Sequence, residues 1–566
     1  MKKFRVLSSV LASALMMTVM SCSSSDDLNG GGADANDKSY LAIRINNVGS
    51  VAGSRAAGDY ADGTADENYI KSVRFYFFNS DGTPYMLKKN GQSTGVNWLE
   101  KTDELNTTDK QNPNVSMISN PLLVIEGNTG ASPAAMIAVI NPTSLDGDKL
   151  GNGAKTLDDV KRSSIYSTFY ATGNKNFVMS NSVYVANGVE KCTSVVTGHV
   201  ATTADAAKNS PVDLYVERVV AKVQPTIDAT YTAADGRKWI EIDGKNAIKV
   251  GTYATNDIYA VVDGWGVADE NGKAELVKQV KTTWNDTNLG INVWTSPDYH
   301  RCFWTSSVAF AAGTEANAPV NHSYNDYAAR KLTDCAYTLP NAPTSVDTDP
   351  YASTLTKMVL AAHLVYKDGT VYKNAEICHY RGQQYLHIDD LKKEVANNFA
   401  DYYIKKNDGT RTKLQASDIE FTTMATGIKD YQVVATLRTL AADESLQKKT
   451  GTTEDESSYT DVTKEALQTL MNAEPAQIRK DGKAYYFIPI RHLGTDPKKV
   501  GYYGIVRNHV YSINIQNMFG FGTPVYDPAK TIDPTIPSND ATYLAARINV
   551  LSWRVVKYNA DLDKTK

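Results

Sequence analysis

Short runs of alternating apolar and less apolar residues recur along the chain and predict β-strands. In residues 72–79, Val73, Phe75 and Phe77 occupy every second position, as on the buried face of a half-exposed strand. Asp-Gly and Asn-Gly pairs, which favour tight hairpin turns, separate many of the runs. The same reading applies to 134–141, 214–227, 357–372 and 483–493. This pattern predicts antiparallel β-sandwiches.

Helical spacing of apolar residues is confined to three segments. Residues 388–406 show it best, with Leu391, Val395 and Phe399 four positions apart. The others are 156–169 and 461–473, the latter with Asp461 placed to cap. We expect these helices to lie at the borders of sheets and not to form a helical core. We also expect a domain boundary near residue 222, and long loops around 310–355 and 436–476.

One strand-like sequence occurs twice. "YLAIRINNV" spans Tyr40–Val48, and "YLAARINVL" spans Tyr543–Leu551. Because alternate residues of a strand share a face, both copies would present the same pattern of side chains and would fit one groove. The shared faces would be Leu41, Ile43 and Ile45 in the first copy and Leu544, Ala546, Ile548 and Val550 in the second. The alternative is that the repeat is a coincidence, since short strands are built from a small set of residue types.

The N-terminus has the pattern of an export signal. A basic start precedes the apolar run 6–20, which is too short for a stable membrane span. The run ends in "VMSC", which is similar to a bacterial lipobox with Cys22 as the lipidated residue. The alternative is a plain secretory signal cut near Ser21. A polar tether, 29–37, follows.

A lone arginine lies between the first copy of the repeat and the body of the chain. Arg55 is surrounded by Gly, Ser and Ala, in a stretch of the kind that proteases cut. Cleavage of the Arg55–Ala56 bond would release the lipid anchor together with the first strand. The remaining sheet would lack a strand, while a strand of similar pattern stands at the C-terminus.

Composition narrows the function classes. The chain has 566 residues, 42% of them hydrophobic, and a formal net charge of -4, which argues against general nucleic-acid binding. The cysteines, five in all, are too few for a disulfide scaffold, and the sequence leaves their pairing open. The four that follow the export signal are Cys192, Cys302, Cys335 and Cys378.

No set of residues with the spacing of a catalytic or metal site stands out. Cys378, His379 and His387 lie close in sequence, but adjacent strand residues point to opposite faces, and a zinc site needs four well-spaced ligands. We therefore expect neither an enzyme nor a cofactor or metal. A surface hydrolase would need clustered acids or a metal triad, which the sequence does not reveal.

Together these features resemble the type V fimbrillin superfamily, and most closely the shaft subunit of the minor fimbria. The resemblance rests on the lipobox at Cys22, "SRAAGD" (54–59), "VERVVAKV" (216–223) and a C-terminal block. That block comprises "RNHVYSINIQNMFGFGTPVYDP" (507–528) and "YLAARINVLSWRVVKY" (543–558). The resemblance covers the whole chain in order, and it is strong at both ends and loose in the long loops of the second domain.

The resemblance implies two transthyretin-like, Greek-key β-sandwich domains and assembly by donor-strand exchange. The expected order is a lipoprotein signal peptide (1–21), a propeptide with a removable first strand (22–55), two β-sandwich domains (56–222 and 223–542) and a donor strand (543–566). Leu41, Ile43 and Ile45 would form the removable plug. The donor strand would use Tyr543, Leu544, Ala546, Ile548, Val550, Leu551, Trp553 and Val555. Trp553 has an equal claim to be a core aromatic of its own domain.

The implied partners are other copies of the chain, accessory anchor and tip subunits, an arginine-specific surface protease, and host or bacterial surface receptors. The implied location is a cell-surface fimbria, reached through an outer-membrane lipoprotein precursor. The alternative, from a different functional class, is a fimbrial tip or accessory adhesin, or a glycan-binding surface lipoprotein, that does not propagate.

Overall fold

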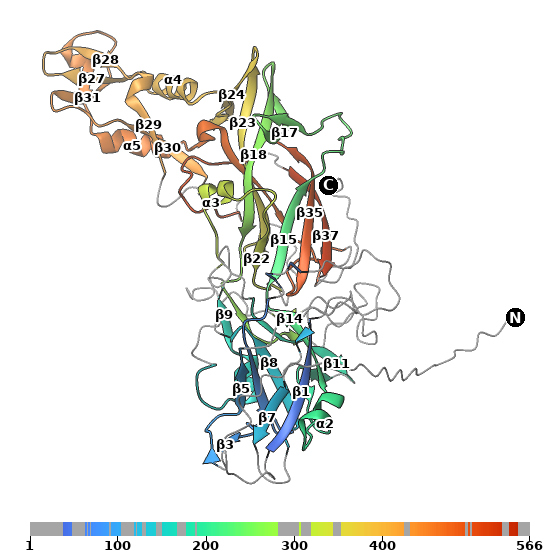
Figure 1. The fold of residues 1–566 in the computed structure, drawn as a ribbon. Coiled ribbons are helices and arrows are strands. Elements are labelled where there is room, and N and C mark those ends of the chain that lie inside the picture. The colour runs from blue at the N-terminus through green and yellow to red at the C-terminus, as the bar shows by residue number, and fades with distance from the viewer. Residues whose placement is uncertain are drawn as a thin grey trace.

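The computed structural model describes most of the chain between residues 38 and 552. The described residues are 38–47, 63–64, 66–67, 69–89, 92–102, 118–119, 122–126, 132–142, 150–166, 177–186, 189–280, 305–306, 319–342, 352–423, 431–492, 496–498, 501–534 and 543–552. They form two β-rich bodies stacked end to end, with a smaller module at one side (Figure 1). The fold is mainly β with few helices, as the alternation predicts.

The first body is built on a large sheet. Its main path runs β4-β3-β7-β1-β14-β10-β8-β2-β5, with β6 paired to β1 and β13 to β8. The strands are β1 (Lys38–Asn47), β2 (Val73–Phe78), β3 (Lys88–Lys89), β4 (Gln92–Ser93), β5 (Trp98–Lys101), β6 (Ile118–Ser119), β7 (Leu122–Glu126), β8 (Ala135–Ile140), β10 (Met179–Asn181), β13 (Ser194–Val195) and β14 (Val212–Arg218). Their buried side chains belong to what we call the first core cluster, together with Leu276, Leu339 and Val506 from later in the chain.

Smaller elements border this sheet. They are α1 (Leu157–Lys161), α2 (Ala204–Asn209), the hairpin of β11 (Tyr184–Ala186) and β12 (Val189–Lys191), and the pair of β9 (Ser164–Tyr166) with β19 (Lys273–Glu275). The helix predicted over 156–169 ends at Lys161, so the prediction is wrong for residues 162–166, and 167–169 lie outside the described residues. Ser163 closes the helix by donating to the carbonyl of Asp159, and the chain then becomes extended, with Ile165 opposite Ala274.

Two sheets face each other across the second body. One has the order β22-β15-β35-β37. The other has the order β16-β17-β18-β23-β34-β36, with β24 paired to β23. Side chains of both sheets, including Ile513 from the first and Trp265 and Leu360 from the second, make the second core cluster. The first residue of this cluster in the chain is Ala221, which follows Val220 of the first cluster.

The strands of the smaller sheet are β15 (Ala221–Ile227), β22 (Ala336–Thr338), β35 (His509–Phe519) and β37 (Tyr543–Ser552). Those of the larger sheet are β16 (Ile240–Ile242), β17 (Lys245–Tyr253), β18 (Asn256–Ala268), β23 (Lys357–Asp368), β24 (Val371–Asn374), β34 (Lys483–Pro489) and β36 (Thr523–Pro524). A short pair, β20 (Gln279–Val280) with β21 (Thr305–Ser306), and helix α3 (Tyr324–Ala329) complete the body. The two-domain Greek-key arrangement and its boundary near residue 222 stay predictions.

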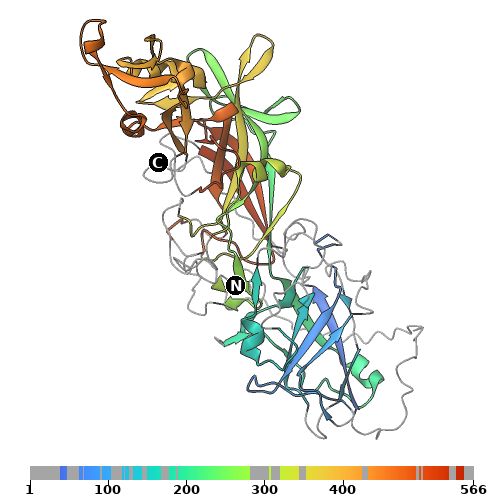
Figure 2. The same cartoon turned by 90° about the vertical axis from the view of Figure 1, so that its left-hand side faces the viewer.

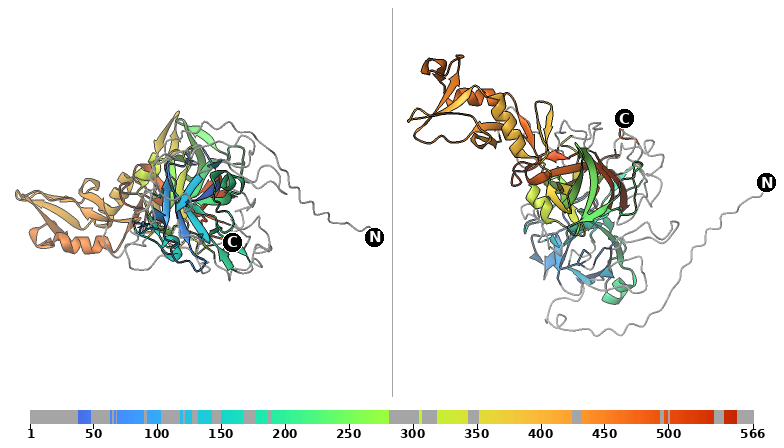
Figure 3. Two further views of the ribbon diagram at one scale, coloured as in Figure 1. Left: turned by 60° about the horizontal axis from the view of Figure 1, so that its bottom comes forward. Right: turned by 90° about the horizontal axis from the view of Figure 1, so that it is seen from above.

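A projecting module, residues 376–479, is inserted between β24 and β34. Figures 2 and 3 show it leaning away from the stacked bodies. It has its own apolar core, in which Leu391 and Val395 of α4 pack with Leu467 of α5. Its strands are β25 (Cys378–Tyr380), β26 (Gln383–Tyr385), β27 (Tyr402–Lys406), β28 (Arg411–Lys413), β29 (Ile419–Thr422), β30 (Gln432–Leu437), β31 (Glu444–Lys449), β32 (Tyr459–Asp461) and β33 (Ala476–Ile478). Its helices are α4 (Ile388–Asn398) and α5 (Lys464–Asn472).

The module corrects three predictions. Residues 436–476, expected as a long loop apart from the helix at 461–473, contain the strands β31 and β32. The helix expected over 388–406 ends at Asn398, because the chain turns to place Tyr402 and Ile404 of β27 in the module core. Helix α5 begins at Lys464 with Thr463, and not Asp461, as its cap.

Candidate functional site

Strand β1, the first copy of the repeat, lies inside the large sheet and not at its edge. Its first half pairs antiparallel with β7, with Leu41 opposite Leu123. Its second half pairs with β14 in parallel, with Ile45 opposite Leu214. Leu41 is 0% exposed and Ile43 is 1% exposed, and both belong to the first core cluster. The plug predicted at Leu41, Ile43 and Ile45 therefore runs through the middle of the sheet.

The neighbours of β1 form an apolar slot. Leu123 and Ile125 of β7 are buried on one side, and Val212 and Leu214 of β14 are buried on the other. Helix α2 lies beside β1, as Figure 1 shows. If β1 were withdrawn, the facing edges of β7 and β14 would lose their ladder partners and these side chains would lose their cover.

The second copy of the repeat, β37, has a different setting. It pairs antiparallel with β35 of the same chain, with Ile548 opposite Ile513 and Ala546 opposite Ile515. It stands at the end of the sheet order β22-β15-β35-β37. The predicted donor residues Tyr543, Leu544, Ala546, Ile548, Val550 and Leu551 all lie on this strand. Trp553 and Val555 lie outside the described residues.

The two copies thus occupy unlike positions. β1 has a neighbour on each side, whereas β37 has a single ladder partner among the described strands. Within one molecule, the C-terminal strand is folded onto its own body. Any transfer of β37 to another molecule would first break its ladder with β35.

The predicted lipidation and cleavage sites, Cys22, Arg55 and Ala56, lie outside the described residues. The chain is described again from residue 63, and there it is firmly held. Glu67 is 1% exposed, and its carboxylate accepts hydrogen bonds from the Nζ of Lys222 at 2.8 Å and from the hydroxyl of Tyr337. The backbone N–H of Thr64 donates to the same carboxylate at 2.8 Å.

Arg218, fully buried, extends this network. Its Nε donates to the carbonyl of Glu67 at 2.9 Å, and its backbone N–H and Nη1 reach Oδ1 of Asn508 at 3.3 Å. We call Glu67, Arg218, Lys222, Tyr337 and Asn508 the clasp. Burial disfavours the charged form of Glu67, but the hydrogen bonds from Lys222 and Tyr337 outweigh it and hold the pKa of Glu67 below its usual value. The clasp joins the segment after Arg55 to both core clusters.

Sequence reasoning missed the clasp. Glu67 stands in "ADENY", a polar stretch that predicts an exposed loop, and its partners Arg218, Lys222 and Tyr337 lie 151 to 270 positions further along the chain. No local spacing could have identified it.

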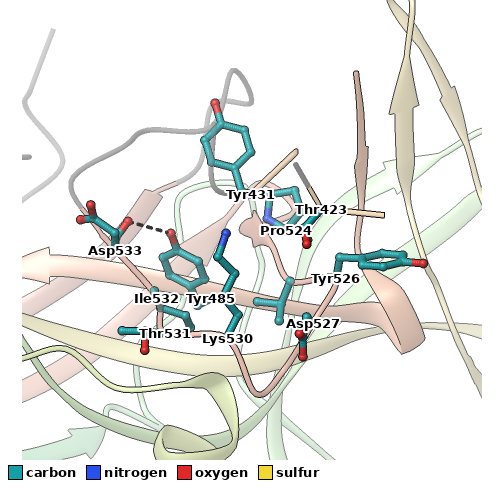
Figure 4. A pocket seen from close by; sticks show the side chains of 11 residues that line it. Thr423, Tyr431, Tyr485, Pro524, Tyr526, Asp527, Lys530, Thr531, Ile532 and Asp533 are labelled. Atoms are coloured by element: carbon teal, nitrogen blue, oxygen red, sulfur yellow. Dashed lines mark hydrogen bonds between the residues drawn. The ribbon is translucent and has the colours of Figure 1, made fainter. Parts of the chain in front are cut away.

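A shallow pocket lies where the projecting module meets the second body (Figure 4). Thr423 and Tyr431 line it from the module, and Tyr485 of β34 lines it from the body. The hydroxyl of Tyr485 donates to the backbone carbonyl of Asp533 at 3.4 Å, drawn as a dashed line in Figure 4. Pro524, Val525, Tyr526, Asp527, Lys530, Thr531 and Ile532 complete the lining. Aromatic rings beside carboxylate and ammonium groups suit a polar ligand.

The described residues hold no group of three or more His, Cys, Asp or Glu side chains arranged to bind a metal ion. Within the same part of the chain, no helix has both the length and the apolar character needed to cross a bilayer. Cys335 and Cys378 carry free thiols, whereas Cys302 lies outside the described residues. Burial raises the pKa of the Cys378 thiol, which makes it a poor nucleophile.

Comparison with known proteins identifies the C-terminal part of the chain. Residues 478–559 match the family model of the C-terminal region of the major fimbrial subunit protein type IV, fimbrillin. This segment contains β34, β35, β36 and β37. The resemblance to fimbrillins is confirmed there. No curated protein sequence matches the chain.

Solved structures of fimbrial proteins are also similar, at low identity. A fimbrillin from Porphyromonas gingivalis has 13% identity and a TM-score of 0.37, over 92% of this chain and 98% of that one. The tip fimbrial protein of the same organism, with a C-terminal truncation, has 8% identity and a TM-score of 0.29, over 91% and 100%. A fimbrial assembly protein from Parabacteroides distasonis has 11% identity and a TM-score of 0.26, over 71% and 97%.

Proposed function

From the fimbrillin-type region at 478–559, we propose that this protein is a structural pilin of a cell-surface fimbria used in adhesion. In this proposal it is exported as a lipoprotein on Cys22 and is cleaved between Arg55 and Ala56. It then polymerises into the shaft by donating its C-terminal strand to the next subunit. It performs no catalysis and needs no cofactor.

The observation that carries the proposal is the position of β1. This strand lies between β7 and β14, with Leu41 and Ile43 in the core. In the sequence it comes before the rest of the first body, and residues 48–62, which include Arg55, connect the two. Cutting after Arg55 leaves β1 held by non-covalent contacts alone. Its departure opens a slot with two unpaired edges, which is a template for an incoming strand.

Rough magnitudes support a tight joint. Each fully buried Leu or Ile side chain contributes about 1.5–3 kcal/mol, and each ladder hydrogen bond adds about 1 kcal/mol. Before cleavage, β1 competes for the slot at an effective concentration on the order of millimolar, so the precursor stays monomeric. Cleavage removes that advantage, and a strand from another molecule can compete on equal terms.

The donor in this proposal is β37. Its sequence repeats that of β1 from Tyr to Asn with one exception, Ala546 at the position of Ile43. Because β37 is paired with β35 in its own chain, exchange requires opening both the slot and the β35–β37 ladder. The joint is heterologous, since slot and donor are different surfaces, and therefore yields an open filament.

Deleting residues 543–566 tests the donor assignment. Mature wild-type protein should form ladders of multimers, and the truncated protein should not.

Since the deletion also uncovers β35, a second experiment avoids any folding defect. A peptide of residues 543–566, added in excess to freshly cleaved wild-type protein, should cap the slot and stop ladder growth. A peptide with Leu544→Asp and Ile548→Asp should leave growth unchanged. Polymerisation by the truncated chain would contradict the assignment.

The variant Arg55→Ala tests the plug. It should remain monomeric in the presence of the arginine-specific protease, whereas wild type assembles and begins at Ala56. Rapid assembly of uncleaved protein would rule out the plug. A surface protein that keeps a lipidated Cys22 would favour an anchored role.

The second candidate is a fimbrial tip or accessory adhesin, or a glycan-binding surface lipoprotein, that does not propagate. The pocket of Tyr485, Tyr526 and Lys530 is the observation in its favour. A tip subunit needs a slot or a donor but not both. Wild-type protein that binds a surface glycan and forms no ladders after cleavage would select this candidate. The shaft model adds anchor and tip subunits and surface receptors as further partners.

A further inference from the structure

Lys357 and Asp269 are buried side by side where β18 ends and β23 begins. Asp269 follows the last residue of β18, Ala268, which pairs with Lys357, the first residue of β23. The side chains of Lys357 and Asp269 are both 0% exposed, and Nζ lies 2.5 Å from Oδ2. No step of the proposed assembly uses this pair.

The surroundings of Nζ orient the amine. It donates to the backbone carbonyl of Ala352 at 2.8 Å and to that of Leu355 at 3.1 Å. A neutral amine has two N–H hydrogens, which these two carbonyls can take. The remaining tetrahedral position, which carries the lone pair, then faces the carboxyl group of Asp269.

The carboxyl group is oriented as well. The Nδ2 of Asn321 donates to its Oδ1 at 3.1 Å, and the backbone N–H of Asp269 donates to Oδ1 of Asn321 at 2.7 Å. The amide of Asn321 therefore polarises one carboxyl oxygen and leaves the other against the amine. Burial raises the pKa of Asp269, although Lys357 and Asn321 oppose the shift.

Burial also sets the thermodynamic direction. An ion pair held away from water carries a large desolvation penalty, which a hydrogen-bonded neutral amide does not. A dry site further removes the water that would reverse a condensation. The pair is thus poised to become a single neutral group.

We propose that Lys357 and Asp269 form an intramolecular isopeptide bond. The lone pair of Nζ attacks Cγ of Asp269, while Asn321 stabilises the developing charge on Oδ1. The Nζ–Cγ bond forms, the Cγ–Oδ2 bond breaks, and Oδ2 leaves as water with two hydrogens from the lysine ammonium group. The ammonium–carboxylate pair is consumed and no oxidant or further reactant is needed.

The bond would fasten β18 to β23 by their side chains. These strands are neighbours in the larger sheet of the second body, and the residues joined are 88 positions apart in the chain. A covalent link across that span would resist unfolding by heat and by pulling. The inference concerns one molecule and does not depend on whether the protein polymerises.

Peptide mass mapping of the full-length, folded protein tests the bond. After denaturation and trypsin digestion, the peptide with Asp269 should be found joined to the peptide with Lys357, at the sum of their masses less one water, about 18 Da. Cleavage after Lys357 should be absent. Two separate, unmodified peptides from the wild type would overturn the proposal without need of any variant.

Two comparisons sharpen the test. Lys357→Arg should give separate peptides and a lower melting temperature than wild type. The buried pair Lys278 and Glu217, 3.0 Å apart, is an internal control, because Oε1 of Glu217 has no hydrogen-bond donor among the described residues to polarise it. Its peptides should stay separate, and a cross-link there instead would also overturn the assignment.

Discussion

The carboxylate of Glu67 accepts a hydrogen bond from the Nζ of Lys222 at 2.8 Å, which ties the stretch after Arg55 to the start of the second body. Lys222 belongs to β15, where the second core cluster begins. In the assembly proposed above, a subunit that loses β1 would still need its two bodies held together. The clasp lies beyond the predicted cleavage site and would therefore survive it.

Glu67→Gln should destabilise the protein by about 1–3 kcal/mol, because Lys222 and the buried Arg218 lose a compensating charge. A double-mutant cycle with Lys222→Met, followed by urea unfolding, should give a coupling energy above about 0.5 kcal/mol. The matched control is the ion pair of Lys449 and Glu454, whose carboxylate is 76% exposed and whose coupling should be near zero. Equal coupling in the two pairs would contradict the clasp.

Asp263 should make stability depend on pH in the acid range. Burial opposes its ionised form, but hydrogen bonds with His363, Lys245 and Tyr324 prevail and lower its pKa from 3.8 to about 2. A depressed folded pKa stabilises the protein above the unfolded pKa, and that stabilisation fades as pH falls toward 2. We expect wild type to exceed Asp263→Asn by about 2 kcal/mol near neutral pH. The gap in unfolding free energy should close on acidification. A gap that stays constant would show that Asp263 is not the group responsible.

Gly266 of β18 should not tolerate a side chain. A Cβ atom there would lie 2.4 Å from Cδ1 of Tyr327, whose ring is 2% exposed and whose hydroxyl bonds the carbonyl of Val267. Gly266→Ala should therefore lower stability by about 2 kcal/mol, measured by thermal unfolding. Gly153→Ala, where no atom lies within 4 Å, serves as control and should be near neutral.

Ala546→Ile should strengthen the filament joint if β37 replaces β1. Ile43 is 1% exposed in the slot, and its counterpart Ala546 would leave space unfilled, at a cost of about 2 kcal/mol or more. Filaments of the variant should need a higher temperature to fall apart in detergent. Ala545→Ile, the counterpart of the buried Ala42 on the other face, should bring no such gain. Weaker filaments from Ala546→Ile would argue against the slot as the acceptor.

Apolar runs bounded by turn residues predicted the strands well, although β2 and β8 are buried on both faces and not on one face only. The runs at 72–79, 134–141 and 214–227 became β2, β8 and the pair β14 and β15. Helix ends were less predictable. Leu391 and Phe399 fit a continued helix by spacing, but the helix stops at Asn398 since Tyr402 is needed in the module core.

Long-range relationships were beyond the sequence. The repeat predicted two similar strands, but not that β1 lies between β7 and β14 while β37 folds onto β35. No local pattern marked Glu67, Lys357 or Asp269 as special. Their partners come from distant segments, and their chemistry depends on how deeply tertiary packing buries them. The roles of Cys22, Arg55, Trp553 and Val555 stay predictions.

The projecting module enters and leaves the second body at adjacent points, since Cys378 near its start pairs with Ile478 at its end. A segment with neighbouring ends can be exchanged for another compact unit without stretching β24 or β34. A polymer of such subunits would repeat whatever replaces residues 376–479 at each step along its length. In a fimbria assembled as proposed above, the insertion point would be a natural place to display a foreign antigen or an enzyme.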